Sequence, residues 1–220
     1  MTRDAVRAAF KDLERLCRYE QIYGIALYAY HTAGPPVFCG STLTGFAERE
    51  ANLRADQSFL NRLRESDVPI KEHIFCDGKW SPYEWEYEAH CWDDFQEIVR
   101  YVDRLECKPD GATTNELHSM VLAAYTACLR DLDQEGLFVK HRRNSSLVLF
   151  CSDCDSSDAA WYQHVSAELL NPSDLYATFY EECIVYYEAE EARLKALLGN
   201  ERQRRFQQYL ALTDVASNEG

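Results

Sequence analysis

The sequence predicts an α+β fold with a central, mostly antiparallel sheet, several α-helices packed on it, and a long C-terminal helix. Two observations lead to this prediction. Short, nearly continuous apolar runs between turn residues are typical of buried strands. Longer segments place apolar residues three and four positions apart, as amphipathic helices do. Apolar residues make up 46% of the 220, so burial can offset chain entropy. We expect one domain over residues 1–216 and a disordered tail at 217–220.

The first third of the chain predicts a helix, a hairpin and a second helix. Val6, Phe10 and Leu13 recur at helical spacing near the start. A run rich in tyrosine and isoleucine then predicts a buried central strand. The turn sequence Ala-Gly-Pro-Pro reverses the chain, so the segment that follows it is expected to pair with this strand as a hairpin. The expected elements are a helix over 3–20, strands over 22–30 and 37–39, and a helix over 44–64.

The middle of the chain contains turn and capping signals. Asp77-Gly78 tolerates the positive φ of a type I′ turn and therefore predicts a hairpin. Thr113 and Glu116 form a capping box, and Gly136 ends the helix that this box opens. The expected elements are a hairpin over 74–80, a strand or short helix over 80–87, an amphipathic helix over 93–105, and a helix over 113–136.

The last third predicts a buried strand followed by helices. Asn171 is a suitable helix cap, Pro172 suits the first turn, and the helix dipole favours Asp174 there. Gly199 breaks the pattern before a final basic segment. The expected elements are a strand over 146–151, a helix over 158–170, a long helix over 171–198, and a basic helix over 201–212.

The acidic residues are concentrated in two segments. Residues 80–99 contain six acids and residues 144–192 contain ten, and neither segment has a lysine or arginine. The net charge is −14, so these segments hold the entire acidic excess. All four tryptophans lie there too. Acid interleaved with aromatic residues indicates a surface that could capture a basic protein. The alternative is an aromatic core beneath a solvated acidic face.

The same charge excludes several classes of partner. Nucleic acid and anionic membranes would be repelled. The chain has no apolar run long enough to cross a bilayer and no signal-peptide pattern at its start, so we expect a cytoplasmic protein. The nine cysteines are odd in number and scattered, which favours reduced thiols in the core over disulfides.

Residues 151–158 give the strongest hint of chemistry. Cys151 and Cys154 have redox or zinc-knuckle spacing, but no second ligand pair accompanies them. Asp153, Asp155 and Asp158 resemble a fragment of a calcium loop that lacks its central glycine and closing glutamate. A thiol-dependent or metal-assisted hydrolase around these residues therefore remains an alternative. A buried Cys151 and a helix-capping Asp155 are the simpler interpretation.

Elsewhere the sequence has no recognisable catalytic pattern. It contains no P-loop, no nucleophile elbow, no dinucleotide fingerprint and no histidine pair with metal-ligand spacing. The three acids of Glu84-x-Glu86-x-Glu88 alternate at strand period and indicate a solvated surface. The basic cluster 140–143 could pair with the acids inside the fold. We therefore expect a protein that is not an enzyme and needs no cofactor.

Several short segments resemble one family. They are Tyr23-Gly-Ile-Ala-Leu-Tyr28, Trp80-Ser-Pro-Tyr-Glu-Trp85, Leu132-Asp-Gln-Glu-Gly-Leu-Phe138, Leu147-Val-Leu-Phe-Cys-Ser-Asp153 and Asn171-Pro172. In order and spacing they are similar to landmarks of the bacterial domain of unknown function 4303 family, over about residues 5 to 180. The sequence departs from the family at Val139, where relatives often have glycine, and in the extension after Phe179.

The resemblance implies an α+β bacterial protein without catalytic residues. Members of the family are often encoded beside polymorphic or type VI secreted toxins, which implies an immunity protein that binds and neutralises a cognate toxin. Many such toxins are basic because they hold phosphates. A regulatory binding module with another partner is the alternative. Trp80 is assigned to the core. The expected partner-binding residues are Glu84, Trp85, Glu86, Asp93, Asp94, Asp153, Asp155, Asp158 and Trp161.

Overall fold

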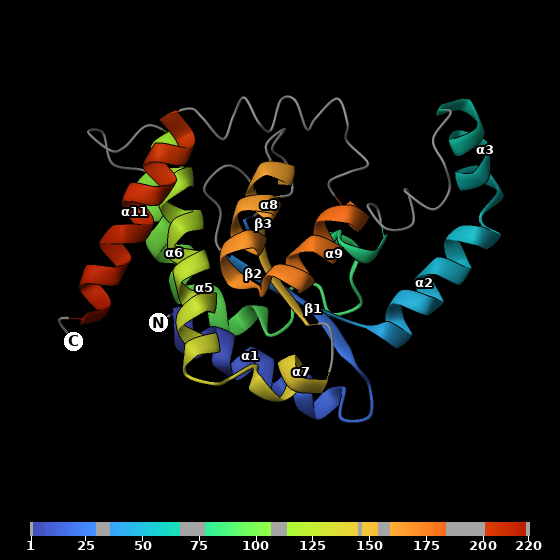
Figure 1. Ribbon diagram of the computed structural model, residues 1–220, viewed down its shortest axis with the longest axis horizontal. Coiled ribbons are helices and arrows are strands. Elements are labelled where there is room, and N and C mark those ends of the chain that lie inside the picture. The colour runs from blue at the N-terminus through green and yellow to red at the C-terminus, as the bar shows by residue number, and fades with distance from the viewer. Residues whose placement is uncertain are drawn as a thin grey trace.

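The computed structural model describes residues 2–29, 36–66, 78–106, 114–144, 147–153, 159–183 and 201–218, and it has the α+β fold that the sequence predicts (Figure 1). Helices are labelled α, 3-10 helices η and strands β. In chain order the elements are α1 (Thr2–Leu16), β1 (Ile22–Ala29), β2 (Pro36–Thr42), α2 (Leu43–Ala55), α3 (Gln57–Ser66), η2 (Pro82–Glu84), η3 (Trp92–Phe95), α5 (Gln96–Glu106), α6 (Thr114–Gln134), α7 (Val139–Asn144), β3 (Val148–Asp153), α8 (Ala159–Leu170), α9 (Ser173–Cys183) and α11 (Glu201–Asn218).

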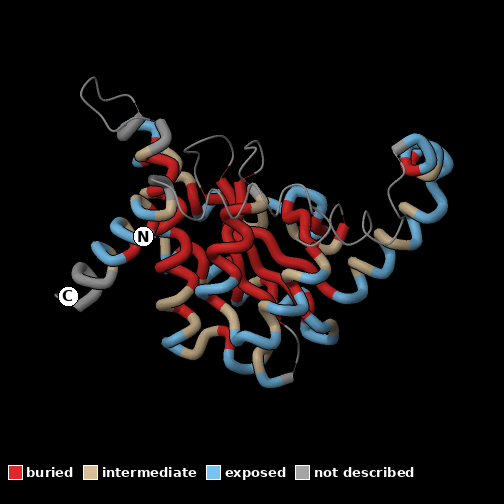
Figure 2. Tube along the Cα trace, turned by 45° about the horizontal axis from the view of Figure 1, so that its top comes forward, coloured by how far each residue is buried: buried red, intermediate tan, exposed pale blue. Residues whose placement is uncertain are grey.

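The sheet is mixed, so the prediction of a mostly antiparallel sheet is wrong. Its strand order is β2-β1-β3. β1 pairs with β2 as an antiparallel hairpin, with Ala26 opposite Cys39. β1 pairs with β3 in parallel, with Ala26 opposite Phe150. A parallel neighbour requires a long crossover, and here the crossover contains the helices from α2 to α7. Every residue of the three strands is buried, as continuous apolar runs predict (Figure 2).

β3 is an edge strand whose outer backbone groups are bound by side chains. Asn171 Oδ1 accepts from the Leu149 N–H (2.9 Å) and Asn171 Nδ2 donates to the Leu149 carbonyl (2.7 Å). Two residues along the strand, Ser166 Oγ accepts from the Cys151 N–H (2.8 Å) and donates to the Cys151 carbonyl (3.2 Å). The side chain of Asn171 thus binds β3, which corrects its predicted role as a helix cap.

Gly136 ends α6, as the sequence predicts. Its φ is +86°, a left-handed conformation that glycine adopts without strain. The Gly136 N–H donates to the Asp133 carbonyl (2.9 Å) and the Leu137 N–H donates to the Leu132 carbonyl (3.0 Å). These two bonds form a Schellman motif. The turn directs Phe138 into the core, where its ring lies 4.7 Å from that of Phe10.

The predicted helix over 44–64 is two helices, α2 and α3. Asp56 separates them because its carboxylate accepts from the Ser58 and Phe59 N–H groups (2.8 and 3.1 Å) and so caps α3. α2 has no buried residue. The two helices extend away from the sheet as an exposed arm (Figures 1 and 2).

The C-terminal half differs from the prediction in two elements. The sequence does not predict α7. The single long helix over 171–198 is not borne out: α9 is 11 residues long, and residues 184–200 lie outside the described residues. α11 packs beside α6 (Figure 1) and buries Phe206 and Leu210 in the same core as β1. The predicted hairpin turn at Asp77 and the capping Thr113 also lie outside the described ranges. None of the described helices is long and apolar enough to cross a membrane.

Candidate functional site

The first acidic segment contains carboxylates that bind the protein's own backbone and side chains. Glu86 Oε1 accepts from the Thr42 N–H and from Thr42 Oγ1 (2.7 and 2.8 Å). Glu86 Oε2 accepts from Ser41 Oγ (2.8 Å) and lies 3.3 Å from Arg49 Nη2. Ser41 and Thr42 are buried. Glu86, a predicted partner-binding residue, therefore holds the end of β2 in place.

Glu88 is exposed and also binds another part of the fold, because it accepts a hydrogen bond from Tyr28 Oη (2.5 Å). The tryptophans of this segment lie in the core. Trp85 is 3% exposed, its Nε1 donates to the Lys79 carbonyl (2.9 Å), and its ring packs edge-on against Phe150. Trp80 is 2% exposed, which confirms its assignment to the core. Trp85 cannot form part of an exposed docking surface, so that prediction is corrected.

All six acids of the segment are exposed, and four of them differ from Glu86 and Glu88 because their side chains bind no other described residue of the fold. Glu84, Asp93, Asp94 and Glu97 are exposed, and their side chains form no ion pair with another described residue. Asp93 and Asp94 lie in η3, and Glu97 lies one turn further on, in α5. Tyr101 follows Glu97 at i+4 and is 49% exposed, so the two share one side of the helix.

We call Asp93, Asp94, Glu97 and Tyr101 the η3–α5 face. The partner-binding residues expected from the sequence include its two aspartates but neither Glu97 nor Tyr101. Helical spacing from Glu97 was the signal that could have identified this tyrosine, because i and i+4 positions lie on the same side of a helix.

The second predicted binding cluster is largely buried. Asp153 at the end of β3 is 1% exposed, and its Oδ2 lies 2.8 Å from His118 Nε2 on α6. The His118 ring lies 4.8 Å from that of Tyr162, and Trp161 is 1% exposed. Asp153 and Trp161 therefore belong to the interior, since tertiary packing closes α6 and α8 over the strand end.

Asp155 and Asp158 lie outside the described residues, as does Cys154. Cys151 is fully buried beside Thr126, whose Oγ1 donates to its Sγ (3.5 Å). Burial raises the pKa of Cys151 to about 12. A thiol in this state keeps its proton at neutral pH and is a poor nucleophile. The hydrolase alternative therefore loses Cys151 as its nucleophile.

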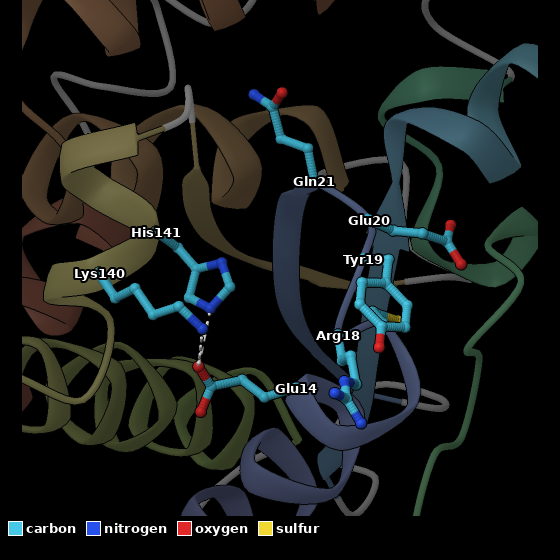
Figure 3. Close-up of a pocket in the computed structure, with 8 residues that line it drawn as sticks. Glu14, Arg18, Tyr19, Glu20, Gln21, Lys140 and His141 are labelled. Atoms are coloured by element: carbon cyan, nitrogen blue, oxygen red, sulfur yellow. Dashed lines mark hydrogen bonds and ion pairs between the residues drawn. The ribbon is translucent and has the colours of Figure 1, made fainter.

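The basic cluster 140–143 pairs with carboxylates of the fold. Figure 3 shows Lys140 and His141 directed at Glu14 across a pocket of about 280 Å³. His141 Nε2 lies 2.9 Å from Glu14 Oε1 and Lys140 Nζ lies 3.6 Å from it. Arg142 Nη2 lies 3.0 Å from Asp133 Oδ2. These pairs use positive charge that could otherwise neutralise the exposed acids.

A second pocket of about 260 Å³ lies between β1 and α9. Glu182 forms part of its wall, accepts from Trp80 Nε1 (2.9 Å) and lies 2.6 Å from Lys79 Nζ. Its charged groups are therefore already bound to one another.

The first pocket is lined by Cys17 as well as by His141 and Glu14. Burial raises the pKa of the Cys17 thiol, and the carboxylates of Glu20 and Glu86 raise it further, so this thiol is a poor nucleophile.

The model of one protein family matches residues 3–172 of the chain; its description is Domain of unknown function (DUF4303). The comparisons with curated proteins and with solved structures find no match. The family model covers more than half of the chain, including all three strands and the η3–α5 face. The chain therefore belongs to the DUF4303 family.

Proposed function

We propose that the protein is a cytoplasmic immunity protein that binds a cognate secreted toxin and neutralises it by covering the toxin's basic surface. The observation that supports this most directly is the η3–α5 face, where three exposed carboxylates without an internal ion pair among the described residues adjoin an exposed tyrosine. An interface of this kind combines charge with a rigid aromatic contact.

The exposed carboxylates supply attraction over distance. Uncompensated negative charge speeds the encounter with a basic partner, because long-range attraction steers the two surfaces together. Toxins that act on nucleic acid hold phosphates and are basic for that reason. An acidic inhibitor competes for the same surface, so occlusion alone blocks the toxin and requires no catalytic residue.

The experiment measures association with a candidate toxin, to be sought among the products of the genes next to the one that encodes this protein. The test variant carries Asp93→Asn, Asp94→Asn and Glu97→Gln. The charge-matched control carries Glu168→Gln, Asp174→Asn and Glu181→Gln, which removes three exposed acids from α8 and α9. We expect the test variant to lower the association rate by about tenfold or more at low salt, and the control to lower it by less than about threefold.

Salt dependence provides the second readout. Raising the ionic strength to roughly 0.5 M should slow association of the unmodified protein and remove most of the difference between the two variants, because salt screens exposed charges. Equal rates for both variants at low salt would exclude the η3–α5 face as the steering surface. Full protection of cells by a Cys154→Ala, Asp155→Ala double variant would exclude the hydrolase alternative.

A further inference from the structure

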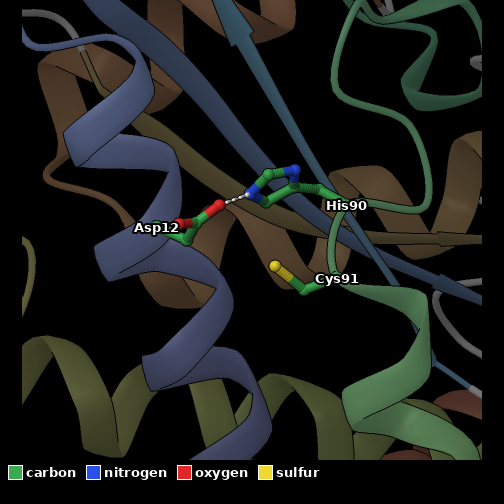
Figure 4. Close-up of side chains that lie close together, drawn as sticks. All are labelled: Asp12, His90 and Cys91. Carbon is green, nitrogen blue, oxygen red and sulfur yellow. Dashed lines mark ion pairs between the residues drawn. The ribbon is translucent and has the colours of Figure 1, made fainter.

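Asp12, His90 and Cys91 bring three different metal-binding groups together. Asp12 lies on α1, and the other two residues precede η3 (Figure 4). Their carboxylate oxygen, imidazole nitrogen and thiol sulfur all lie within 4.8 Å of one another. Within the part of the chain that the structure describes, no other group of three such side chains comes this close.

The backbone around His90 has an unusual conformation that lets two adjacent residues face Asp12. Ala89 and Cys91 are the two non-glycine residues with positive φ in the described ranges, at 51° and 56°. A left-handed conformation costs roughly 1 kcal/mol or more at each. Along an extended chain, neighbouring side chains point to opposite sides, whereas Figure 4 shows His90 and Cys91 both directed toward α1.

Hydrogen bonds hold this loop in position. The His90 N–H donates to the Phe38 carbonyl of β2 (3.0 Å), and the Trp92 N–H donates to the Ala89 carbonyl (3.1 Å). The Asp94 N–H donates to the Cys91 carbonyl (2.9 Å). The loop is therefore fixed to the central sheet on one side and to η3 on the other, so the two side chains are preorganised.

The side chains are oriented as metal ligands would be. Arg15 binds Asp12 Oδ1 through Nη2 (2.6 Å) and Nε (3.1 Å). The other oxygen, Oδ2, lies 3.3 Å from His90 Nε2. That nitrogen is buried and has no hydrogen-bond partner of good geometry among the described residues. Arg15 thus fixes the carboxylate with one oxygen directed at the histidine, as groups around a metal site commonly do.

We propose that Asp12, His90 and Cys91 bind one divalent transition-metal ion of the zinc class, with water completing a tetrahedral site. Sulfur and nitrogen ligands together suit zinc and disfavour calcium and magnesium, which prefer oxygen. Asp12 and His90 are partly exposed, with side chains 35% and 14% accessible, so an ion can enter from solvent.

A nucleophilic Cys-His-Asp arrangement is the competing interpretation of the same three side chains. The carboxylate of Asp12 lies beside the Cys91 thiol, with its oxygen within 4.8 Å of the sulfur. A nucleophilic cysteine needs the opposite environment, with positive charge nearby. A metal ion supplies that positive charge itself, so the carboxylate of Asp12 assists its binding.

The test uses the full-length protein, stripped of metal and kept reduced, titrated with Co²⁺ as a spectroscopic probe and with Zn²⁺ by calorimetry. We expect one ion per chain and a thiolate-to-cobalt charge-transfer band. Cys91→Ser should abolish the band and weaken binding by at least about 100-fold. Asp12→Asn should weaken binding by about tenfold or more. Glu48→Gln, which removes an exposed acid from α2, is the control for general electrostatic attraction and should change affinity by less than about threefold.

A second measurement requires no variant. Zn²⁺ should protect Cys91 of the unmodified protein from alkylation, read out at that residue by mass spectrometry. Alkylation of Cys91 at the same rate with and without Zn²⁺ would overturn the proposal. A cobalt band that survives in a folded Cys91→Ser protein would overturn it too, because the metal would then be held by other cysteines.

Discussion

Glu84 and Glu86 lie two residues apart in the same acidic segment but have different physical roles. Glu84 is exposed in η2 and has no ion pair among the described residues. Glu86 receives hydrogen bonds from two buried residues at the end of β2, Ser41 and Thr42. A carboxylate that satisfies buried donors contributes to folding, whereas a carboxylate that binds no other group contributes mainly to the field outside the protein.

Replacing Glu86 by alanine should destabilise the protein by about 2–4 kcal/mol, because the Thr42 N–H and the Ser41 and Thr42 hydroxyls would lose their acceptor in a buried position. The matched change Glu84→Ala should alter stability by less than about 0.5 kcal/mol. Urea unfolding of both variants measures the difference. Equal unfolding midpoints for the two variants would contradict the role assigned to Glu86.

At the residue scale, the exposed residues of the candidate docking surface could be predicted only in part. Acids and aromatics alternate between residues 83 and 97, and the alternation does not say which side chains face inward. Trp85 lies in the core because Gly24 on β1 leaves room for its ring: a Cβ there would lie 2.7 Å from the ring. His118 was not predicted at all, since its partner Asp153 is 35 residues away and only packing brings them together.

At the scale of elements, the outer edge of β3 is covered by side chains that act in place of a fourth strand. Asn171 and Ser166 bind Leu149 and Cys151, the strand residues whose backbone groups point away from β1. An edge strand with free backbone groups invites pairing with other chains. The polar side chains of α8 and of the turn after it remove that hazard.

Asn171→Ala should cost about 2–3 kcal/mol of stability, because the Leu149 N–H and carbonyl would lose their partners. Asn171→Asp should be destabilising as well, since a carboxylate oxygen would replace the amide that donates to the Leu149 and Ala167 carbonyls. Ser173→Ala, at the exposed start of α9, is the control and should cost less than about 1 kcal/mol. Thermal unfolding of the three variants at matched protein concentrations measures whether both Asn171 variants lose more stability than Ser173→Ala.

The existence of elements was easier to predict than their arrangement. The apolar runs of β1 and β3 and the stop at Gly136 are local signals, and the structure confirms all three. The parallel pairing of β1 with β3 depends on the path of the chain between them, which local spacing does not specify. The break between α2 and α3 occurs because the Asp56 side chain caps α3, and the helical spacing of apolar residues does not reveal this cap.

At the scale of the whole molecule, the core extends past the segment that the family model matches. Phe179, Phe206 and Leu210 follow residue 172, yet all three belong to the same hydrophobic cluster as β1. Trp161 lies 6.0 Å from Phe206, ring to ring, so α11 covers part of the family segment. The family match therefore does not coincide with a complete hydrophobic core.

A chain that ends at residue 172 should fail to fold cooperatively, because it would expose the surface that α9 and α11 cover. A chain that ends at residue 218 should unfold in one transition, like the full-length protein. Circular dichroism during urea unfolding measures how cooperatively each of the two shortened chains unfolds. Binding of a hydrophobic dye measures how much apolar surface each one exposes. A sharp transition and no dye binding for the shorter chain would show that α9 and α11 are dispensable.

The parallel pairing of β1 with β3 has a consequence for how the protein is made. Roughly 120 residues separate the end of β1 from the start of β3, which corresponds to about 6–24 s of translation. Throughout that interval one edge of β1 lacks its neighbour in the nascent chain, and α11 emerges later still. The hairpin of β1 and β2 must therefore wait at the ribosome with unpaired backbone groups along one edge and apolar side chains on its faces. During this period, chaperones that hold such segments would govern the yield of folded protein.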